Sequence, residues 1–327
     1  MPKEIVHMGL AQEVARKIPA DSIFCDAIHR YLNLFSYGAV APDTCFHYIL
    51  GPGRAAVNSA GQIFHTTDAS SLVPVLEFLN RFPHKDADAL AFAAGLCCHI
   101  MTDTVFHPMV YYFSGAKGIH GNADTRHRMF ETALDLHFRS LMHTRRRLIP
   151  FHRMSKHLEI SDKRLSCLLK HIFCKDNPEY QKYLLYAFRS HCLANALFTN
   201  HHLYQLTHMV SAFNFLTEYE VLFYPFKQPV RFRFFDGILK FKHPVSGEEY
   251  GQTLESLSNK AVKNTLLLLS VIEAAILGGK NLDDVIFDPH LPEISPCLPE
   301  DCRSFMHWHG DMDIRRKLYS EYSEITV

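Results

Sequence analysis

The stretch AGLCCHIMTDTVFHPM, residues 94–109, places His99, Asp103 and His107 at intervals of four in an otherwise apolar segment. Residues four apart lie on nearly the same face of an α-helix, so the three side chains would point in one direction. Burying imidazoles and a carboxylate costs several kcal/mol unless they are hydrogen-bonded or bind a metal. The spacing therefore fits either a polar stripe packed against water or another helix, or a ladder of metal ligands.

A second ladder follows in RHRMFETALD, where His127 and Glu131 are four residues apart and Asp135 lies one step further. An imidazole nitrogen and a carboxylate oxygen at this spacing can both approach one cation to about 2.0–2.2 Å. Two such ladders facing each other on adjacent helices can hold two or more metal ions. The alternative is an exposed helix face, because Arg126 and Arg128 flank the histidine.

Three further candidates are isolated in the sequence. His7 lies in IVHMGLA, Asp43 ends GAVAPD directly after a proline, and His65 lies in QIFHTTD. Taken singly, each is explained at least as well as a surface or helix-capping residue.

Charge and composition limit the partners. The 327 residues contain 34 Lys and Arg against 34 Asp and Glu, so no global field attracts nucleic acid or an anionic membrane. Histidine is unusually frequent, with 22 residues, whereas the nine cysteines form no C-x-x-C pair. A thiolate zinc site is therefore not expected.

Membrane and targeting signals are not evident in the sequence. The longest apolar run, TLLLLSVIEAAIL, has 13 residues and contains Glu273, which is too short to span a bilayer. The first residues, MPKEIVHMGLAQEV, carry no apolar signal core. We therefore expect a cytoplasmic location.

Helical periodicity dominates the chain and predicts a mainly α protein. One loop is expected over residues 36–70, and Pro108 is expected to end a helix at His107. We predict two regions, a metal-cluster helical domain over residues 1–149 and a C-terminal helical region over 150–327 that packs on it. Helices are predicted over 22–35, 71–82, 86–107, 123–143, 161–175, 178–197, 201–223 and 252–278.

One segment, VRFRFFDGILKFK over residues 230–242, has the alternation of a β-hairpin around Asp236 and Gly237. Its aromatic residues alternate with basic ones. They either anchor the protein at a membrane surface or pack on the core, and core packing is the commoner outcome.

The ordered set of these residues resembles the zinc-dependent phospholipase C family. The match consists of His7, GAVAPD, FHTTD, HIMTDTVFH and HRMFE in that order, and it covers roughly residues 1–145. Related proteins are the amino-terminal domain of glycosylphosphatidylinositol-specific phospholipase D and the single-strand-specific zinc nucleases.

The resemblance implies a multi-helix bundle that binds two or three zinc ions, and the alternation in residues 230–242 adds a small β-hairpin in the C-terminal half. The implied ligands are Asp43, His65, His99 and Asp103 for one zinc, His107, His127 and Glu131 for a second that Asp103 bridges, and His7 with Asp103 for a third.

The chemistry of the residues fits this function independently. Histidine and carboxylate ligands without thiolate suit zinc. Two metals about 3.5–4 Å apart can clamp a phosphodiester and activate water. Asp43 is the candidate general base, because a carboxylate beside metals can accept the proton of the attacking water. We therefore expect metal-dependent phosphodiester hydrolysis in lipid metabolism, by a phospholipase C-like reaction.

Two alternatives remain open. The same scaffold could serve a zinc-dependent nuclease, although the neutral charge makes nucleic acid a less expected partner. The cluster could instead stabilise a non-catalytic binding protein.

The segment YYFSGAKGIHGNADTRH links the two ladders and should lie at the mouth of the site. Its Tyr112, Lys117 and His120 are candidates to bind a phosphate or a lipid headgroup, and an ordinary exposed loop is the alternative. The expected partner is a phospholipid or another phosphodiester, with peripheral membrane contact.

Overall fold

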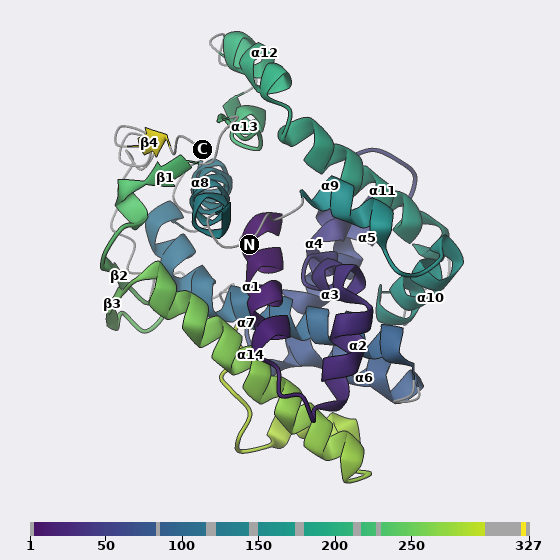
Figure 1. The fold of residues 1–327 in the computed structure, drawn as a ribbon. Helices are drawn as coiled ribbons and strands as arrows, with labels where there is room; N and C mark the ends of the chain where they lie inside the picture. Colours follow the sequence, from purple (N-terminus) through teal and green to yellow (C-terminus); the bar gives the residue numbers. More distant parts are fainter. Residues whose placement is uncertain are drawn as a thin grey trace.

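The computed structural model of the protein describes residues 3–82, 86–115, 122–143, 150–173, 180–211, 217–226, 230–297 and 322–324. The fold is mainly α, as predicted (Figure 1). Its α-helices are α1 (Glu4–Lys17), α2 (Ile23–Arg30), α3 (Leu32–Gly38), α4 (Ala41–Thr44), α5 (Arg54–Gly61), α6 (Val73–Arg81), α7 (Ala87–Ser114), α8 (Ala123–His143), α9 (Phe151–Met154), α10 (Asp162–Phe173), α11 (Gln181–Phe198), α12 (His201–Ser211), α13 (Thr217–Glu220) and α14 (Leu254–Leu277).

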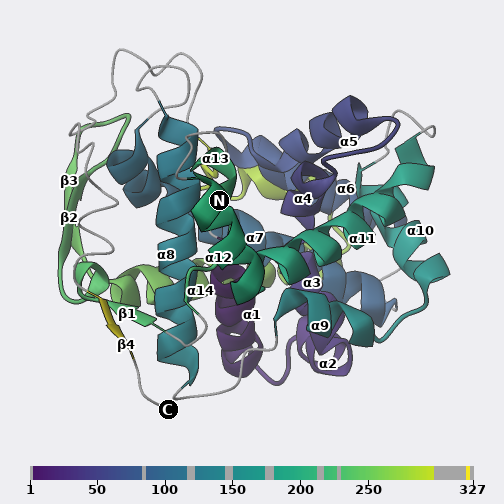
Figure 2. The same cartoon turned by 90° about the horizontal axis from the view of Figure 1, so that it is seen from above.

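Helix α7 is the centre of the bundle. Helices α1, α2, α3, α6, α8 and α14 all pack against it, and α1 lies beside α8 in both views (Figures 1 and 2). By length and hydropathy alone α7 could cross a membrane, but 94% of its most apolar 18-residue window is buried inside the fold. Such burial is typical of a core helix, and it puts the first ladder of polar residues at the centre of the molecule.

The prediction that Pro108 ends this helix is wrong. Helix α7 continues through Pro108 to Ser114. A proline inside a helix removes one backbone hydrogen bond and costs about 3 kcal/mol. Here Phe106, Met109 and Val110 on either side of the proline are fully buried, and burial of such side chains contributes about 1.5–3 kcal/mol each. Packing therefore outweighs the local preference.

The region expected to be one loop contains short helices. The chain forms α4, α5 and the 3-10 helices η1 (Cys45–His47), η2 (Gln62–Phe64) and η3 (Ala69–Leu72). Asp68 caps η3 by accepting a hydrogen bond from the backbone N–H of Ser70 at 2.9 Å. The predicted helix over 22–35 is likewise two helices, α2 and α3, which meet at Tyr31. Helices α6, α10, α11 and α14 lie close to their predicted positions, and α8 has the predicted bounds. The predicted helix over 201–223 is wrong at its end, because the described residues form α12 and the short α13 and leave the helix after Glu220. Helices α1 and α9 were not predicted.

The strands are correct, but the predicted pairing of 230–242 with itself is wrong. Strand β1 (Val230–Phe232) pairs antiparallel with β4 (Tyr322–Glu324), whereas β2 (Leu239–Lys242) pairs with β3 (Glu249–Gln252). The 3-10 helix η6 (Arg233–Phe235) separates β1 from β2. The hairpin of the C-terminal half is therefore β2–β3.

The apolar side chains of this region pack inward. Phe232, Leu239 and Phe241 are buried, and Phe234 packs edge-on against Phe113 and Phe130. Of the two interpretations of the alternation, core packing is the one that the fold bears out.

Candidate metal centre

The first ladder lies on one side of α7, as its spacing predicts. His99, Asp103 and His107 are all buried, with at most 2% of their surface exposed. The Nε2 atoms of His99 and His107 are 3.3 and 3.8 Å from the two carboxylate oxygens of Asp103. The carboxylate of Asp103 therefore lies between the two imidazoles.

Side chains from other elements converge on the same carboxylate. His7 of α1 brings Nε2 to 3.4 Å from Asp103 Oδ1, and His65, directly after η2, brings Nε2 to 3.8 Å from Oδ2. Asp43 of α4 completes the group, with Oδ1 at 3.5 Å from His65 Nε2 and 3.9 Å from His99 Nε2. His7, Asp43 and His65 therefore lie beside the middle of α7, although all three come from the first 65 residues.

The second ladder supplies another set beside the first. His127 and Glu131 of α8 face His107 across the α7–α8 contact, and the ligand atoms of these three residues lie within 4.8 Å of one another. The Nε2 atom of His127 is 2.9 Å from Glu131 Oε1. The face of α8 that carries these residues is therefore turned toward the core and not toward solvent.

The separations suit ligands of a common ion. Two atoms bound tetrahedrally at 2.0–2.2 Å are about 3.3–3.6 Å apart, whereas hydrogen-bonded N and O atoms are about 2.7–3.2 Å apart. The contacts of Asp103 with His7 and His99, at 3.4 and 3.3 Å, have the spacing of ligands of a common ion, and the contact with His107, at 3.8 Å, is slightly longer. All three exceed the usual hydrogen-bond distance. Within the described residues these buried atoms have no hydrogen-bond partner: Nε2 of His7, His65, His99 and His107, Oδ1 of Asp43, and both oxygens of Asp103. Buried polar atoms are rarely left in this state, so the residues present fit a bound cation.

Outer contacts turn these imidazoles toward the centre. Nδ1 of His65 lies 2.9 Å from the carbonyl of Gly61, and Nδ1 of His99 lies 3.0 Å from the carbonyl of Ala39. Because a carbonyl oxygen only accepts, each Nδ1 carries the proton and each Nε2 keeps a lone pair. This is the arrangement that orients histidine ligands in metal sites.

The contact at His99 depends on two glycines. A Cβ built on Gly95 of α7 would lie 2.2 Å from the carbonyl oxygen of Phe35 and 2.7 Å from the Cα of Gly38, which ends α3. A Cβ on Gly38 would lie 2.5 Å from the carbonyl oxygen of Phe92. Both positions need glycine so that the backbones of α3 and α7 can touch. This close approach brings the carbonyl of Ala39, the next residue, to His99.

The third outer contact comes from far along the chain. Residues 291–297, which we call the C-terminal strap, pass over the end of α7, where Nδ1 of His107 donates to the carbonyl of Pro296. Two further hydrogen bonds hold the strap there: Ser295 N donates to Thr104 Oγ1 at 3.1 Å, and Cys297 N donates to the carbonyl of Thr66 at 3.1 Å. The strap therefore fixes the orientation of a candidate ligand.

At His7, His107, Asp43 and Asp103 the electrostatics favour the protonation states that a metal requires, whereas at His99 they oppose it. Burial lowers the pKa of His7 and lowers that of His107 to about 3, so both imidazoles are neutral near pH 7. Burial by itself raises the pKa of Asp103 and Asp43, but the facing histidines outweigh it and hold both pKa values below their usual range. The pKa of His99 is raised, because Asp103 and Asp43 outweigh its burial.

Thiols take no part in these ligand sets. Cys98 is adjacent to His99 in sequence, and burial raises the pKa of its thiol to about 12. A thiol of this kind stays protonated at neutral pH and is a poor ligand. The donors are therefore imidazole nitrogens and carboxylate oxygens, which suit zinc.

The structure brings together all eight predicted ligands, and their role as ligands stays a prediction. Of the predicted substrate-binding residues, Lys117 and His120 lie outside the described residues. Tyr112 is buried, its ring contacts that of Phe113, and its role stays a prediction.

The sequence reasoning missed Tyr111. Its ring lies 5.0 Å from that of His107 and 5.2 Å from that of His127, and its hydroxyl is 3.5 Å from Cys297 Sγ in the strap. Tyr111 is four residues beyond His107, so continuing the ladder by one step would have found it.

Comparison with known proteins gives a match to a family model, and that match agrees with this geometry. No curated protein and no solved structure matches the chain. A family model described as zinc dependent phospholipase C matches residues 6–192, more than half of the chain and further than the motifs that carry the resemblance. Together with the ligand sets, this match supports zinc binding and a metal-dependent, phospholipase-like role. The chain belongs to the zinc-dependent phospholipase C family.

Proposed function

We propose that the protein is a phosphodiester hydrolase that binds two or three zinc ions and cleaves phospholipids on the glycerol side of the phosphate, releasing a phosphorylated headgroup. The observation that supports this most strongly is the convergence of buried atoms without hydrogen-bond partners around Asp103. Such a cluster has no structural use unless cations occupy it, and the family of the chain acts on phospholipids.

The ligands divide between two neighbouring groups and a shared carboxylate. Asp43, His65 and His99 would hold one zinc with Asp103, and His7 would hold a further ion with the same carboxylate. His107, His127 and Glu131 form the other group. When bound, zinc supplies positive charge that neutralises the phosphodiester and makes water more acidic.

Asp43 is the residue that we propose as general base. It is buried at the edge of the cluster with 7% of its surface exposed, whereas Asp103 has none exposed. His99 and His65 hold the pKa of Asp43 below its usual range, so the side chain is a carboxylate near pH 7. A carboxylate so placed can accept the proton of water as it attacks phosphorus.

The test is turnover of phosphatidylcholine by zinc-loaded protein, followed by release of phosphocholine. We expect Asp43→Asn to lower turnover by about 100-fold or more, the usual contribution of a general base, with the zinc content measured in parallel. Loss of turnover with zinc retained supports the proposal. Zinc retained with no turnover of any phosphodiester by the unmodified protein would contradict it, and cleavage of single-stranded DNA alone would indicate the nuclease alternative.

Contact with a bilayer requires an exposed apolar surface. Leu193 of α11 and Met209 of α12 are 61% and 70% exposed, and α12 projects from the body of the molecule (Figure 1). Tyr186, Leu197 and Leu206 on the same two helices are also exposed. We propose that this surface, which we call the α11–α12 face, contacts the phospholipid surface.

Vesicle binding tests the α11–α12 face. We expect the double change Leu193→Asp and Met209→Asp to weaken binding to phosphatidylcholine vesicles while leaving hydrolysis of a short-chain, monomeric phosphatidylcholine unchanged. The matched control is Leu277→Asp, because Leu277 is 70% exposed at the end of α14, at the opposite side of the molecule (Figure 1). Equal vesicle binding by the double variant and the control would contradict the proposal.

A further inference from the structure

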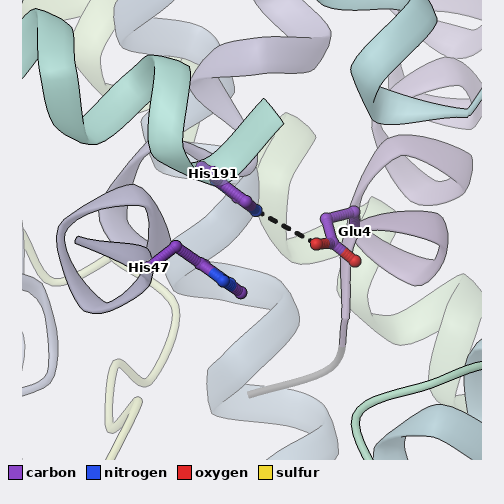
Figure 3. A group of neighbouring side chains, drawn as sticks. All are labelled: Glu4, His47 and His191. Carbon is purple, nitrogen blue, oxygen red and sulfur yellow. Dashed lines mark hydrogen bonds and ion pairs between the residues drawn. The ribbon is translucent and has the colours of Figure 1, made fainter. Parts of the chain in front are cut away.

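A second group of metal-ligating side chains lies outside the centre described above. It consists of Glu4, the first residue of α1, His47, the last residue of η1, and His191 on α11 (Figure 3). One ligand atom of each lies within 4.8 Å of the other two, which is the spacing that also relates the members of the candidate metal centre. The three residues come from separate parts of the chain, so tertiary folding alone brings them together.

His191 is already oriented for binding. Its ring is fully buried, with Nδ1 at 3.1 Å from Thr44 Oγ1 and Nε2 at 3.0 Å from Glu4 Oε1. Because a carboxylate only accepts, Nε2 donates to Glu4, and Nδ1 accepts from the hydroxyl of Thr44. A bound cation would take the place of the Nε2 proton, and Nδ1 could then donate to the hydroxyl of Thr44, as outer partners of histidine ligands do in metal sites.

His47 is held by stacking and not by hydrogen bonds. Its ring lies parallel to that of His191, with 3.9 Å between the centroids and 4° between the planes. Its backbone carbonyl accepts from Ser190 Oγ at 2.7 Å, whereas its ring makes no hydrogen bond to another residue in the described part of the chain. A ligand atom of the ring already lies within 4.8 Å of ligand atoms of Glu4 and His191, and Figure 3 shows the three side chains gathered together.

The carboxylate of Glu4 is buried, with 6% of the residue exposed. Its oxygens lie 3.0 Å from His191 Nε2 and 3.4 Å from the hydroxyl of Tyr224, and His191, His47 and Lys3 outweigh its burial and hold its pKa below the usual range. A buried carboxylate is costly unless it is paired with positive charge. A divalent cation between Glu4 and the two imidazoles would add positive charge at this carboxylate.

We propose that Glu4, His47 and His191 bind a zinc ion that is separate from the candidate metal centre. Two imidazoles and one carboxylate are a common zinc ligand set, with the fourth position open to water. Bonds of 2.0–2.2 Å require the three ligand atoms to lie about 3.3–3.6 Å apart. The contact between His191 and Glu4, now 3.0 Å, would therefore lengthen slightly on binding, and the His47 ring would adjust to complete the set.

The position of the ion gives it a structural role. Glu4 lies three residues before His7 on α1, and His47 lies four residues after Asp43 in the α4–η1 segment. The ion therefore ties the start of α1 and the end of η1 to α11. It fixes two backbone segments that carry ligands of the centre without contacting the substrate.

The experiment combines metal counting with diffraction. Unmodified protein, purified without chelator and loaded with zinc, is crystallised and measured at the zinc absorption edge. We expect an anomalous peak between Glu4, His47 and His191. We expect His47→Gln to bind one zinc equivalent fewer per chain, whereas the matched control His290→Gln, which changes an exposed histidine, keeps the full number.

The outcomes separate this inference from the proposed function. His99→Ala should lose zinc from the candidate metal centre and keep the peak at Glu4. Absence of the peak in the unmodified protein overturns the inference, as does an unchanged zinc content in folded His47→Gln. If His47→Gln does not fold, the diffraction result decides alone. A protein that shows the peak but cleaves no phospholipid would contradict the proposed function only.

Discussion

Replacing Gly95 by alanine tests how far the candidate metal centre depends on the packing of α3 against α7. The added Cβ would lie 2.2 Å from the carbonyl oxygen of Phe35, so relief to an ordinary contact of about 3.3 Å requires the helices to separate by roughly 1 Å. The hydrogen bond from His99 to the carbonyl of Ala39, now 3.0 Å, would lengthen to about 4 Å and be lost.

Two effects on stability oppose each other. Overpacking costs about 1–3 kcal/mol, whereas alanine in place of glycine inside a helix gains about 0.5–1 kcal/mol. We therefore expect a net loss of no more than about 2.5 kcal/mol. The effect on zinc should be larger, because loss of an outer partner of a histidine ligand lowers metal affinity by about 10–100-fold.

The assay is zinc affinity by competition with a chromophoric chelator, beside thermal unfolding of the metal-free protein. The control is Gly251→Ala in β3, where an added Cβ has only the end of the Ile238 side chain nearby, at 3.3 Å. A Gly95→Ala protein that binds zinc as tightly as the unmodified protein would refute the reasoning.

Three further predictions concern the same centre. Asp103→Asn should lower zinc affinity by more than about 100-fold and abolish turnover, since this carboxylate lies between the imidazoles of His99 and His107. Equilibrium dialysis with elemental analysis measures the zinc affinity, and retention of all the zinc would contradict the site. Zinc affinity should fall on acidification, by about tenfold per pH unit once the pH is below the raised pKa of His99, because that imidazole must lose its proton to bind zinc. Chelator competition from about pH 8 to about pH 6 measures this slope. A zinc affinity that does not change with pH would contradict the prediction. Removal of zinc should lower the free energy of unfolding by about 2.7 kcal/mol relative to protein with free zinc at 100 times the dissociation constant. Chemical unfolding with and without chelator measures this difference. Equal stability in the two conditions would count against a native metal site.

Local patterns predicted the helices well where periodicity and end signals agree. Helix α8 has its predicted bounds because Asp124 lies in its first turn and its apolar face is continuous. Pro108 misled the prediction because the rule for proline describes an isolated segment. Burial of Phe106 and Met109 on either side is a tertiary effect that no local rule contains.

The pairing of the strands could not be predicted, for a related reason. Alternation in residues 230–242 correctly predicted extended chain at β1 and β2. It could not predict that β1 pairs with Tyr322–Glu324, about ninety positions further along, because pairing depends on the global path of the chain.

The candidate site, like the fold, could be predicted only in part from the sequence. His99, Asp103 and His107 could be found because a four-residue step is visible in the sequence. The groups that orient the imidazoles are backbone carbonyls, including those of Ala39 and Gly61, and a carbonyl leaves no trace in residue type.

The C-terminal strap determines when, during synthesis of the chain, the centre can reach its final geometry. His107 and the carbonyl of Pro296 that orients it are separated by 189 positions. A ribosome must therefore reach Pro296 before this contact can form. Closing so long a loop is a slow step in folding. A chain that has emerged only to residue 192 holds every candidate ligand of the centre but not the orientation of His107. Zinc binding with its final geometry is thus a late event, which can follow only after the strap has been synthesised.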